Sequence, residues 1–424
     1  MASKGPSVDA LRHLIRTHPL IDNHAHNILA QEHACNYRKY PFESITSEAQ
    51  GLALDNAVNT LPLIRAANQL SELYGCSPDW DDVKAARGQW VQRDYQGLVS
   101  RCLDGTHALL LDDLLTDHDI EPYGWHDQFT VSATKRIVRI EVAASKMLMR
   151  FVHANRNIRH EISDFRICRD VFKSFQEQFE DLIHQSVADP DVAGFKSVIC
   201  YRTGLSIEEH GTDAVVHSLR RTMQQGAGFC IVDDKPLNDW LVLRTLNILQ
   251  YAKRCDFSRP LQLHTGLGDS DMSLLLSNPA HLQPVVAGYP EVDFVLLHSS
   301  YPYTREAGYL ACVYPNAYLD LGEVFPMVSR DAEESIIRES LEITPTNRLL
   351  WSTDGHFFPE TYWLSNQQFR QTLETVCYTC MFYGDDANPE GFCGLCRQGG
   401  LHREPGHESS SGYTVPQLQP TLQA

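Results

Sequence analysis

The sequence lacks any long uninterrupted run of apolar residues. Within its 424 residues no stretch approaches the roughly 20 apolar residues that a membrane-spanning helix needs. Residues 1–19 intersperse charged side chains such as Lys4, Asp9 and Arg12 among the apolar ones, so the apolar core of a secretory signal is missing. We therefore expect no membrane contact and no signal peptide.

Positive charge is also scarce. Lysine and arginine together number 36 against 54 aspartates and glutamates, which gives a formal net charge of −18. Nucleic acid and anionic lipid surfaces would repel such a chain, so neither is expected as a partner. An anionic small-molecule substrate would need a locally positive pocket.

The cysteines do not form the spaced framework of a secreted disulfide protein. Many of the 12, such as Cys200, Cys230 and Cys312, stand alone inside apolar segments. This usage indicates reduced, buried thiols and predicts a cytoplasmic protein. Hydrophobic residues make up 43% of the chain, which is ample for a large core.

Short apolar runs alternate with longer helical stretches, and this pattern predicts the fold. The first run is Leu20–Ile21, and seven later segments have strand character: 107–112, 136–141, 195–201, 260–264, 292–298, 317–322 and 348–354. Strands separated by helices pair in parallel through right-handed crossovers. Eight of them predict an α/β fold of the (β/α)8 TIM-barrel type.

Residues 28–104 interrupt this alternation. Leu61, Ile64, Leu70 and Leu73 show helical periodicity, with little strand character around them. The segment is far longer than an ordinary strand-to-helix connection. We expect a helical insertion over one end of the barrel.

Two histidines one residue apart, His24 and His26, follow the first strand run. Side chains alternate along a strand, so both imidazoles face the same way and form half of a metal site. By itself such a pair is more often solvated or hydrogen-bonded in a core. Other strand runs also end on polar residues that can bind metal: Glu141, His264, His298 and Asp354. Because active sites of these barrels lie at the C-terminal ends of the strands, we expect these side chains to converge.

Five motifs carry a resemblance to a known family: 22–27 (DNHAHN), 264–269 (HTGLGD), 298–309 (HSSYPYTREAGY), 320–326 (DLGEVFP) and 351–356 (WSTDGH). They resemble the amidohydrolase superfamily of the amidohydrolase 2 type. More narrowly, they resemble the amidohydrolase-like N-terminal half of fungal FluG-type developmental proteins and of plant nodulin–glutamine-synthetase fusions. The resemblance spans about residues 8–376. It departs from the pattern in two ways, because the glutamine-synthetase-like half is absent and the chain beyond Val376 matches nothing in it.

The resemblance implies a metal-dependent barrel over residues 1–376, in which His24, His26 and Asp354 bind a divalent metal, usually zinc. His264 is implied as a further ligand. Asp354 is then the candidate general base and later proton donor, acting with a metal-activated water. His298 would contact either the substrate oxyanion or a second metal, so one or two ions are expected.

Lys196 has two readings. A lysine on the fourth strand is carboxylated and bridges two metals in some members of the superfamily. It could equally form a salt bridge to Glu141 or Asp320 inside the barrel. Glu141 and Glu323 are further candidates for substrate binding.

The substrate is predicted from two arginines. Arg202 follows the fourth strand and Arg305 the sixth, where a guanidinium could bind a substrate carboxylate. The alternative is a surface arginine paired with a glutamate such as Glu306. The fusion proteins suggest a glutamyl or amino-acid-derived amide, and they leave open a glutamine-synthetase-like partner and a homo-oligomer.

Three functions follow from this reading. The first is a metal-dependent hydrolase that cleaves a C–N bond of a small molecule. The second is a metal-dependent non-oxidative decarboxylase, which needs the same ligands. The third is a non-catalytic developmental or interaction module, which the intact ligand set makes the least favoured.

The segment 377–424 supports two incompatible readings. Cys377, Cys380, Cys393 and Cys396 form two Cys-x-x-Cys pairs that could bind a structural zinc. The surrounding sequence is rich in Gly, Pro, Ser and Gln and has few apolar residues. Residues 412–416 look like the family's continuation resuming after an interruption, which an unremoved intervening sequence or a splice form would produce. We expect a mostly disordered tail that catalysis does not need.

Overall fold

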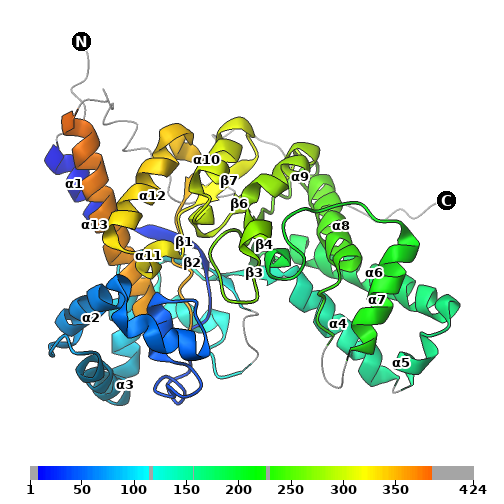
Figure 1. The fold of residues 1–424 in the computed structure, drawn as a ribbon, viewed down its shortest axis with the longest axis horizontal. Coiled ribbons are helices and arrows are strands. Elements are labelled where there is room, and N and C mark those ends of the chain that lie inside the picture. Colours follow the sequence, from blue (N-terminus) through cyan, green and yellow to red (C-terminus); the bar gives the residue numbers. More distant parts are fainter. Residues whose placement is uncertain (1–7, 114–117, 156, 226–229, 384–424) are drawn as a thin grey trace, which may run out of the picture.

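Eight parallel strands form the centre of the molecule. The computed structural model describes residues 8–113, 118–155, 157–225 and 230–383. The strands are β1 Leu20–Ala25, β2 Thr106–Asp112, β3 Lys135–Arg139, β4 Val192–Ser197, β5 Leu261–Leu263, β6 Phe294–Leu296, β7 Ala317–Asp320 and β8 Leu349–Leu350. Each pairs in parallel with the next, in chain order (Figure 1). The predicted TIM-type barrel is confirmed.

Backbone hydrogen bonds connect β1 to the segment that follows β8. The amide of Asn23 donates to the carbonyl of Trp351 at 3.1 Å, and the amide of Asp354 donates to the carbonyl of His24 at 3.0 Å. Next along, the amide of His26 donates to the carbonyl of Gly355 at 2.7 Å. The chain therefore closes the barrel beside its first strand and places Asp354 next to both histidines.

Several strands are shorter than the sequence indicated. β3 ends at Arg139, and helix α4 (Ile140–Ala154) begins at once, so Glu141 lies in a helical turn instead of at a strand end. The segment predicted as the fourth strand continues after Ser197 as the 3-10 helix η4 (Ile199–Tyr201). β8 contains only two residues.

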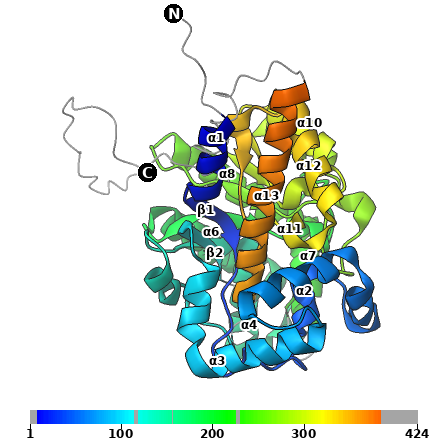
Figure 2. The ribbon, with the colours of Figure 1, turned by 90° about the vertical axis from the view of Figure 1, so that its left-hand side faces the viewer.

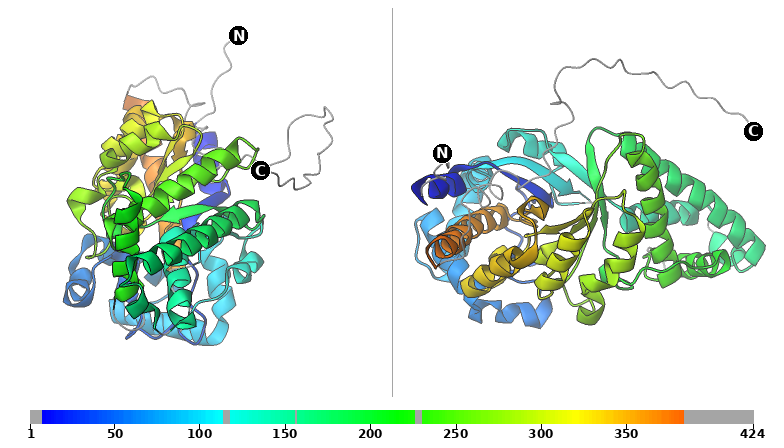
Figure 3. Two further views of the ribbon diagram at one scale, coloured as in Figure 1. Left: turned by 90° about the vertical axis from the view of Figure 1, so that its right-hand side faces the viewer. Right: turned by 90° about the horizontal axis from the view of Figure 1, so that it is seen from above.

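Helices surround the sheet, and their buried faces complete the core. They are α1 Val8–Thr17, α4, α5 Ile158–Glu161, α6 Phe165–Ala188, α7 Thr212–Gln224, α8 Lys235–Lys253, α9 Gln283–Gly288, α10 Thr304–Val313, α11 Val324–Met327, α12 Arg330–Ile343 and α13 Pro359–Tyr383. In α6, Phe172, Phe175, Phe179 and Ile183 recur at helical spacing and are buried. α1 and α13 lie at one end of the molecule and α5 to α7 at the other (Figure 1; Figure 3). None of the described helices is long and apolar enough to cross a membrane.

The helical insertion after the first strand is also confirmed. Between β1 and β2 the chain forms η1 Phe42–Thr46, η2 Gly51–Asn59, α2 Leu61–Tyr74 and α3 Trp80–Cys102. Thr60 caps α2 by accepting from the amide of Leu63, and Asp79 caps α3 by accepting from two amides of its first turn. Figure 2 shows α2 and α3 across the lower end of α13.

A buried ion pair fastens this insertion to α13. Arg87 Nε lies 2.6 Å from Glu360 Oε1, and both side chains are fully buried. The guanidinium also donates to the carbonyl of Ala34 and lies 4.9–5.0 Å from the ring centroids of Phe42 and Phe358. Glu360 belongs to the first turn of α13, only a few residues after Asp354, so the pair supports the segment that carries this aspartate.

Helix α13 extends past the boundary that the sequence suggested. It continues from Val376 to Tyr383, and Cys377 is buried against the core. The domain boundary after Val376 therefore falls inside a helix, and the expected disorder does not begin there. Residues 384–424, with Cys393 and Cys396 of the proposed zinc knuckle, lie outside the described residues.

We predict that Arg87→Met destabilises the fold by about 3–5 kcal/mol, because it leaves the Glu360 carboxylate buried without its partner. Arg305→Ala is the matched control, since it breaks an exposed pair with Glu342 and costs at most about 1 kcal/mol. Urea unfolding followed by circular dichroism measures both. Equal losses in the two variants would show that the buried pair is not a main attachment of the insertion.

Candidate metal centre

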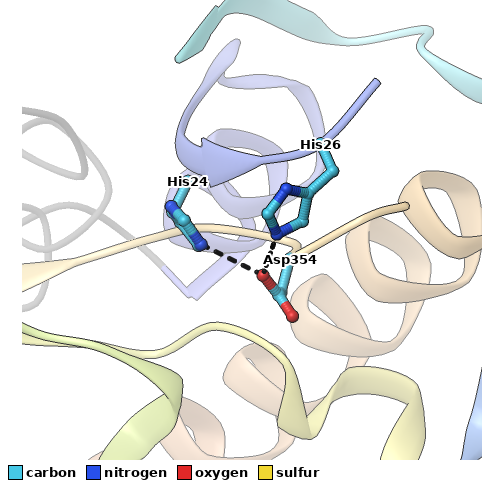
Figure 4. Close-up of side chains that lie close together, drawn as sticks. All are labelled: His24, His26 and Asp354. Carbon is cyan, nitrogen blue, oxygen red and sulfur yellow. Dashed lines mark ion pairs between the residues drawn. The ribbon is translucent and has the colours of Figure 1, made fainter. Parts of the chain in front are cut away.

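His24, His26 and Asp354 meet at the C-terminal end of the barrel (Figure 4). His24 lies in β1, His26 directly follows it, and Asp354 comes from the segment after β8. Asp354 Oδ1 is 3.2 Å from His24 Nε2 and 3.4 Å from His26 Nε2. The predicted convergence of these three side chains is therefore observed.

The hydrogen-bond partners of His26 indicate which of its ring nitrogens carries a hydrogen and which faces Asp354. His26 Nδ1 is 2.9 Å from the carbonyl oxygen of Asp112. A carbonyl only accepts, so Nδ1 carries the hydrogen, and in the neutral ring Nε2 presents a lone pair toward Asp354. Asp354 Oδ1 is buried and has no hydrogen-bond partner among the described residues. Donor atoms that share a tetrahedral ion at about 2.0–2.2 Å stand about 3.3–3.6 Å apart. The separations of 3.2 and 3.4 Å are close to this range, so the residues present fit a bound divalent cation.

The protonation states of His24 and Asp354 suit metal binding. Burial, followed by the charge of Lys196, lowers the pKa of His24 to about 4, so its imidazole is neutral at pH 7. Burial raises the pKa of Asp354, but His298 and the contacts with His24 and His26 hold it well below its usual value. Neutral imidazoles and an ionised carboxylate are the forms that bind metal.

Asp354 also belongs to a second group, with His298 and Glu323. His298 lies in η7 (His298–Ser300) after β6, and Glu323 follows β7. His298 Nδ1 is 3.1 Å from Glu323 Oε2, and both side chains are about 1% exposed. Within the described part of the chain, neither ring nitrogen of His298 nor Glu323 Oε2 has a hydrogen-bond partner.

All three members of this second group have strained backbone conformations. The φ angles of His298, Glu323 and Asp354 are 67°, 64° and 51°, which non-glycine residues rarely adopt. Such conformations cost about 1–3 kcal/mol each and concentrate at functional sites. Glu323 is the centre of a γ-turn, in which the amide of Val324 donates to the carbonyl of Gly322 at 2.8 Å.

Gly322 is required beside this turn. A Cβ atom at Gly322 would stand 1.9 Å from Ser352 Oγ and 2.7 Å from Asp320 Oδ2. Any other residue would push apart the ends of β7 and β8. The segment after β7 is therefore held tightly against its neighbour, with Glu323 directed toward His298.

Two buried aspartates position the site, and the sequence reading missed their role. Asp22 accepts from the amide of Thr353 at 3.0 Å and from its hydroxyl at 2.5 Å, and burial raises its pKa to about 8. Asp320 accepts from Asn23 Nδ2 at 2.6 Å and from Ser352 Oγ at 2.8 Å, and burial raises its pKa to about 6. Asp22 stands two residues before His24, so strand alternation could have indicated that it points into the barrel.

Lys196 lies at the centre, as predicted. Its Nζ is 3.0 Å from His24 Nε2, and burial lowers its pKa to about 8. The alternative salt bridges of Lys196 to Glu141 or Asp320 are absent from the ion pairs of the described residues. Whether Lys196 is carboxylated stays a prediction.

His264 lies beside the centre without joining either group. Its ring centroid is 4.3 Å from that of His298 and 4.3 Å from that of Tyr201. Its Nε2 is 2.6 Å from the carbonyl oxygen of Leu267 and therefore donates there. A role as metal ligand would have to use Nδ1, and it stays a prediction.

The residues predicted to contact the substrate lie in different places in the structure. Glu141 accepts from Ser197 Oγ and from the amide of Val198, so one oxygen anchors the end of β4. Its other oxygen, Oε2, is buried and has no hydrogen-bond partner within the described ranges. Arg202 is partly exposed in the loop after β4, 3.7 Å from Asp271. The prediction for Arg305 is wrong. Its side chain is 64% exposed and pairs with Glu342 of α12 at 3.0 Å, outside the barrel.

Comparison with known proteins agrees with the fold. The amidohydrolase family model matches residues 207–379. Protein fluG of Emericella nidulans is 62% identical over 384 residues, which are 89% of this chain and 44% of that protein. Together these matches support a FluG-like assignment within the amidohydrolase superfamily. The chain spans less than half of the length of that relative.

Solved structures with the same fold are more distant in sequence. A Lactobacillus casei protein assigned as a metal-dependent hydrolase has a TM-score of 0.73 at 23% identity, covering 92% of this chain and 96% of that one. Uronate isomerase from Thermotoga maritima has a TM-score of 0.58 at 12% identity, covering 94% and 96%. At these identities the likeness establishes the fold alone.

We predict that purified protein retains a divalent metal through dialysis and that the double variant His24→Ala, His26→Ala loses it. The reason is that the variant removes both imidazole donors to the ion. His210→Ala, His281→Ala is the matched control, because neither residue belongs to a metal-binding group in the described part of the chain. Elemental analysis measures both variants. Unchanged metal content in the His24, His26 variant would contradict this assignment.

Proposed function

We propose that the protein is a metal-dependent hydrolase that cleaves an amide-type C–N bond of a small molecule. One observation carries the proposal, namely that Asp354 faces Nε2 of His26, whose Nδ1 contacts the Asp112 carbonyl, inside a buried, strained barrel mouth. When the ring is neutral, no hydrogen lies between Nε2 and the carboxylate. This arrangement suits a cation and a reacting molecule.

Zinc is the ion that we propose for this site. Two imidazoles and one carboxylate leave a position open for water or substrate, as catalytic zinc sites do. A divalent ion held there would polarise a carbonyl group and lower the pKa of water.

The residues of the chain then supply the proton transfers. Asp354 is ionised and buried beside the histidines, so it can accept a proton from the attacking water and later return it to the leaving nitrogen. Neither ring nitrogen of His298 has a hydrogen-bond partner among the described residues, so this side chain can orient the substrate in the same space. In the neutral ring, His26 presents its Nε2 lone pair because the Asp112 carbonyl holds the hydrogen on Nδ1.

Arg202 is the remaining candidate for binding a substrate carboxylate. It follows η4 on the mouth side, and its contact with Asp271, at 3.7 Å and largely exposed, is weak. We propose that an acidic amide would displace this contact. Arg305 has no such role, since it is committed to the outer helices.

We expect Asp354→Asn to lower turnover by about 10²- to 10⁴-fold, because it keeps the side-chain shape but removes the proton acceptor. The measurement is a scan of amides and aromatic carboxylates with wild type and variant, with circular dichroism and metal content as controls. Arg305→Ala is the activity control and should match wild type.

The products decide between the candidate reactions. Release of ammonia or an amine supports hydrolysis. Release of carbon dioxide from an aromatic carboxylate would instead identify the reaction as decarboxylation. Full activity in Asp354→Asn with unchanged metal content would contradict the assigned role of Asp354.

A further inference from the structure

One segment of the helical insertion lies at the barrel mouth. Residues 47–50 join η1 to η2, and η1 packs against α11, the short helix that follows β7. On the other side, Gln50 Nε2 donates to Asp269 Oδ2 at 3.5 Å, in the loop that follows β5. The amide of Ala49 donates to Ser47 Oγ at 3.1 Å, which fixes the turn between these two contacts. The segment is therefore held between the loops after β5 and β7.

Glu48 is the acidic residue of this segment, and it is partly buried. Its charge acts on Glu323 and on Tyr201. The charges of Asp354 and Asp269 act on Glu48 in turn. These four residues follow β7, β4, β8 and β5, so Glu48 lies where the C-terminal ends of the strands meet. In the described part of the chain, no hydrogen bond or ion pair engages its carboxylate.

The basic groups of the mouth do not balance this carboxylate. Burial raises the pKa of Glu48 to about 7, although the charge of His356 opposes this effect. Arg202 faces a different carboxylate, that of Asp271, at 3.7 Å. A positively charged ligand beside Glu48 would stabilise its ionised form.

A second carboxylate points independently to a ligand in the same place. Glu323 is 2% exposed, and its Oε2 has no hydrogen-bond partner among the described residues. After burial, the charge of Glu48 is the next cause that raises the pKa of Glu323. Two carboxylates that repel each other in a mostly buried place are costly unless a positive charge compensates them.

We infer that Glu48 binds a protonated amine of the substrate, so that the substrate is an amide that also carries a primary or secondary ammonium group. This inference rests on the proposed hydrolase function and names the substrate class. An ammonium group offers two or three N–H donors, and carboxylates that lack donors accept them. Glu48 belongs to neither group of residues whose ligand atoms could share a metal ion in the described structure, so its ligand is an organic cation.

The ammonium site is compatible with the carboxylate contact proposed for Arg202. Arg202 directly follows η4, whereas Glu48 comes from the insertion. A substrate that carries both groups therefore meets opposite charges on two separate segments. An amide without the amine would leave Glu48 unpaired and bind less well.

The test is the binding of n-butylammonium to the whole purified chain at pH 8, measured by isothermal titration calorimetry. n-Butanol is the neutral probe of the same size, and wild type should bind the cation in preference to it. Glu48→Gln should bind the cation about 10- to 100-fold more weakly, because it removes a charge-assisted hydrogen bond. Glu48→Asp keeps the charge and should retain more of the binding than Glu48→Gln.

Glu72→Gln is the matched control, because Glu72 is an exposed glutamate of the same insertion, in α2. It should bind n-butylammonium as wild type does, and both Gln variants should keep the metal content of wild type. Equal affinity of wild type and Glu48→Gln for the cation would overturn the ammonium site. Absence of binding by wild type would overturn it as well.

Amide turnover separates this inference from the proposed function. If amides are hydrolysed, those with a free amine should be preferred over their N-acetylated forms, and Glu48→Gln should lose this preference. A preference that Glu48→Gln does not change would overturn the inference and leave the hydrolase standing. Glu48-dependent binding of n-butylammonium without hydrolysis of any amide would overturn the hydrolase and leave the ammonium site standing.

Discussion

The closure of the barrel between its first strand and the segment after its last is the interaction on which the site depends. The amide of Asp354 donates to the carbonyl of His24, and Asp22 binds both the amide and the hydroxyl of Thr353. These bonds fix Asp354 beside the two imidazoles, although more than 300 residues separate them along the chain. Without this closure the three side chains would have no common position.

The buried polar groups behind the site explain why it can be rigid. Asn23 and Ser352 both donate to Asp320, which also accepts from the amide of Gly322 at 3.0 Å. A network in which every member has partners fixes one arrangement of the strand ends. By contrast, both ring nitrogens of His298 and Oε2 of Glu323 lack a hydrogen-bond partner among the described residues, which marks where the fold ends and the binding site begins.

Much of this arrangement was predictable from the sequence, because it follows from local rules. Strand alternation places His24 and His26 on one face, and polar residues after apolar runs placed Asp354 and His298 at the mouth. The barrel and its helical insertion were predictable from the same alternation of apolar runs and helical stretches. The family resemblance then supplied the roles of these residues.

The failures have physical causes that a sequence does not display. Arg305 pairs with Glu342 because α10 packs beside α12, and this tertiary contact cannot be read from the local sequence. Nothing in the motif of Glu323 reveals the γ-turn that places it beside His298, and its role as a substrate contact stays a prediction. Val376 looked like the end of the last helix because amphipathicity fades there, yet Cys377 is still buried against the core.

The most direct test of this account is X-ray absorption at the edge of the metal that copurifies with the full chain. The account predicts only nitrogen and oxygen neighbours at about 2.0–2.2 Å, with the outer scattering of imidazole rings. Sulfur neighbours at about 2.3 Å would place the metal on the cysteines of the C-terminal segment instead. That result, or the absence of any metal, would contradict a catalytic centre built on His24, His26 and Asp354.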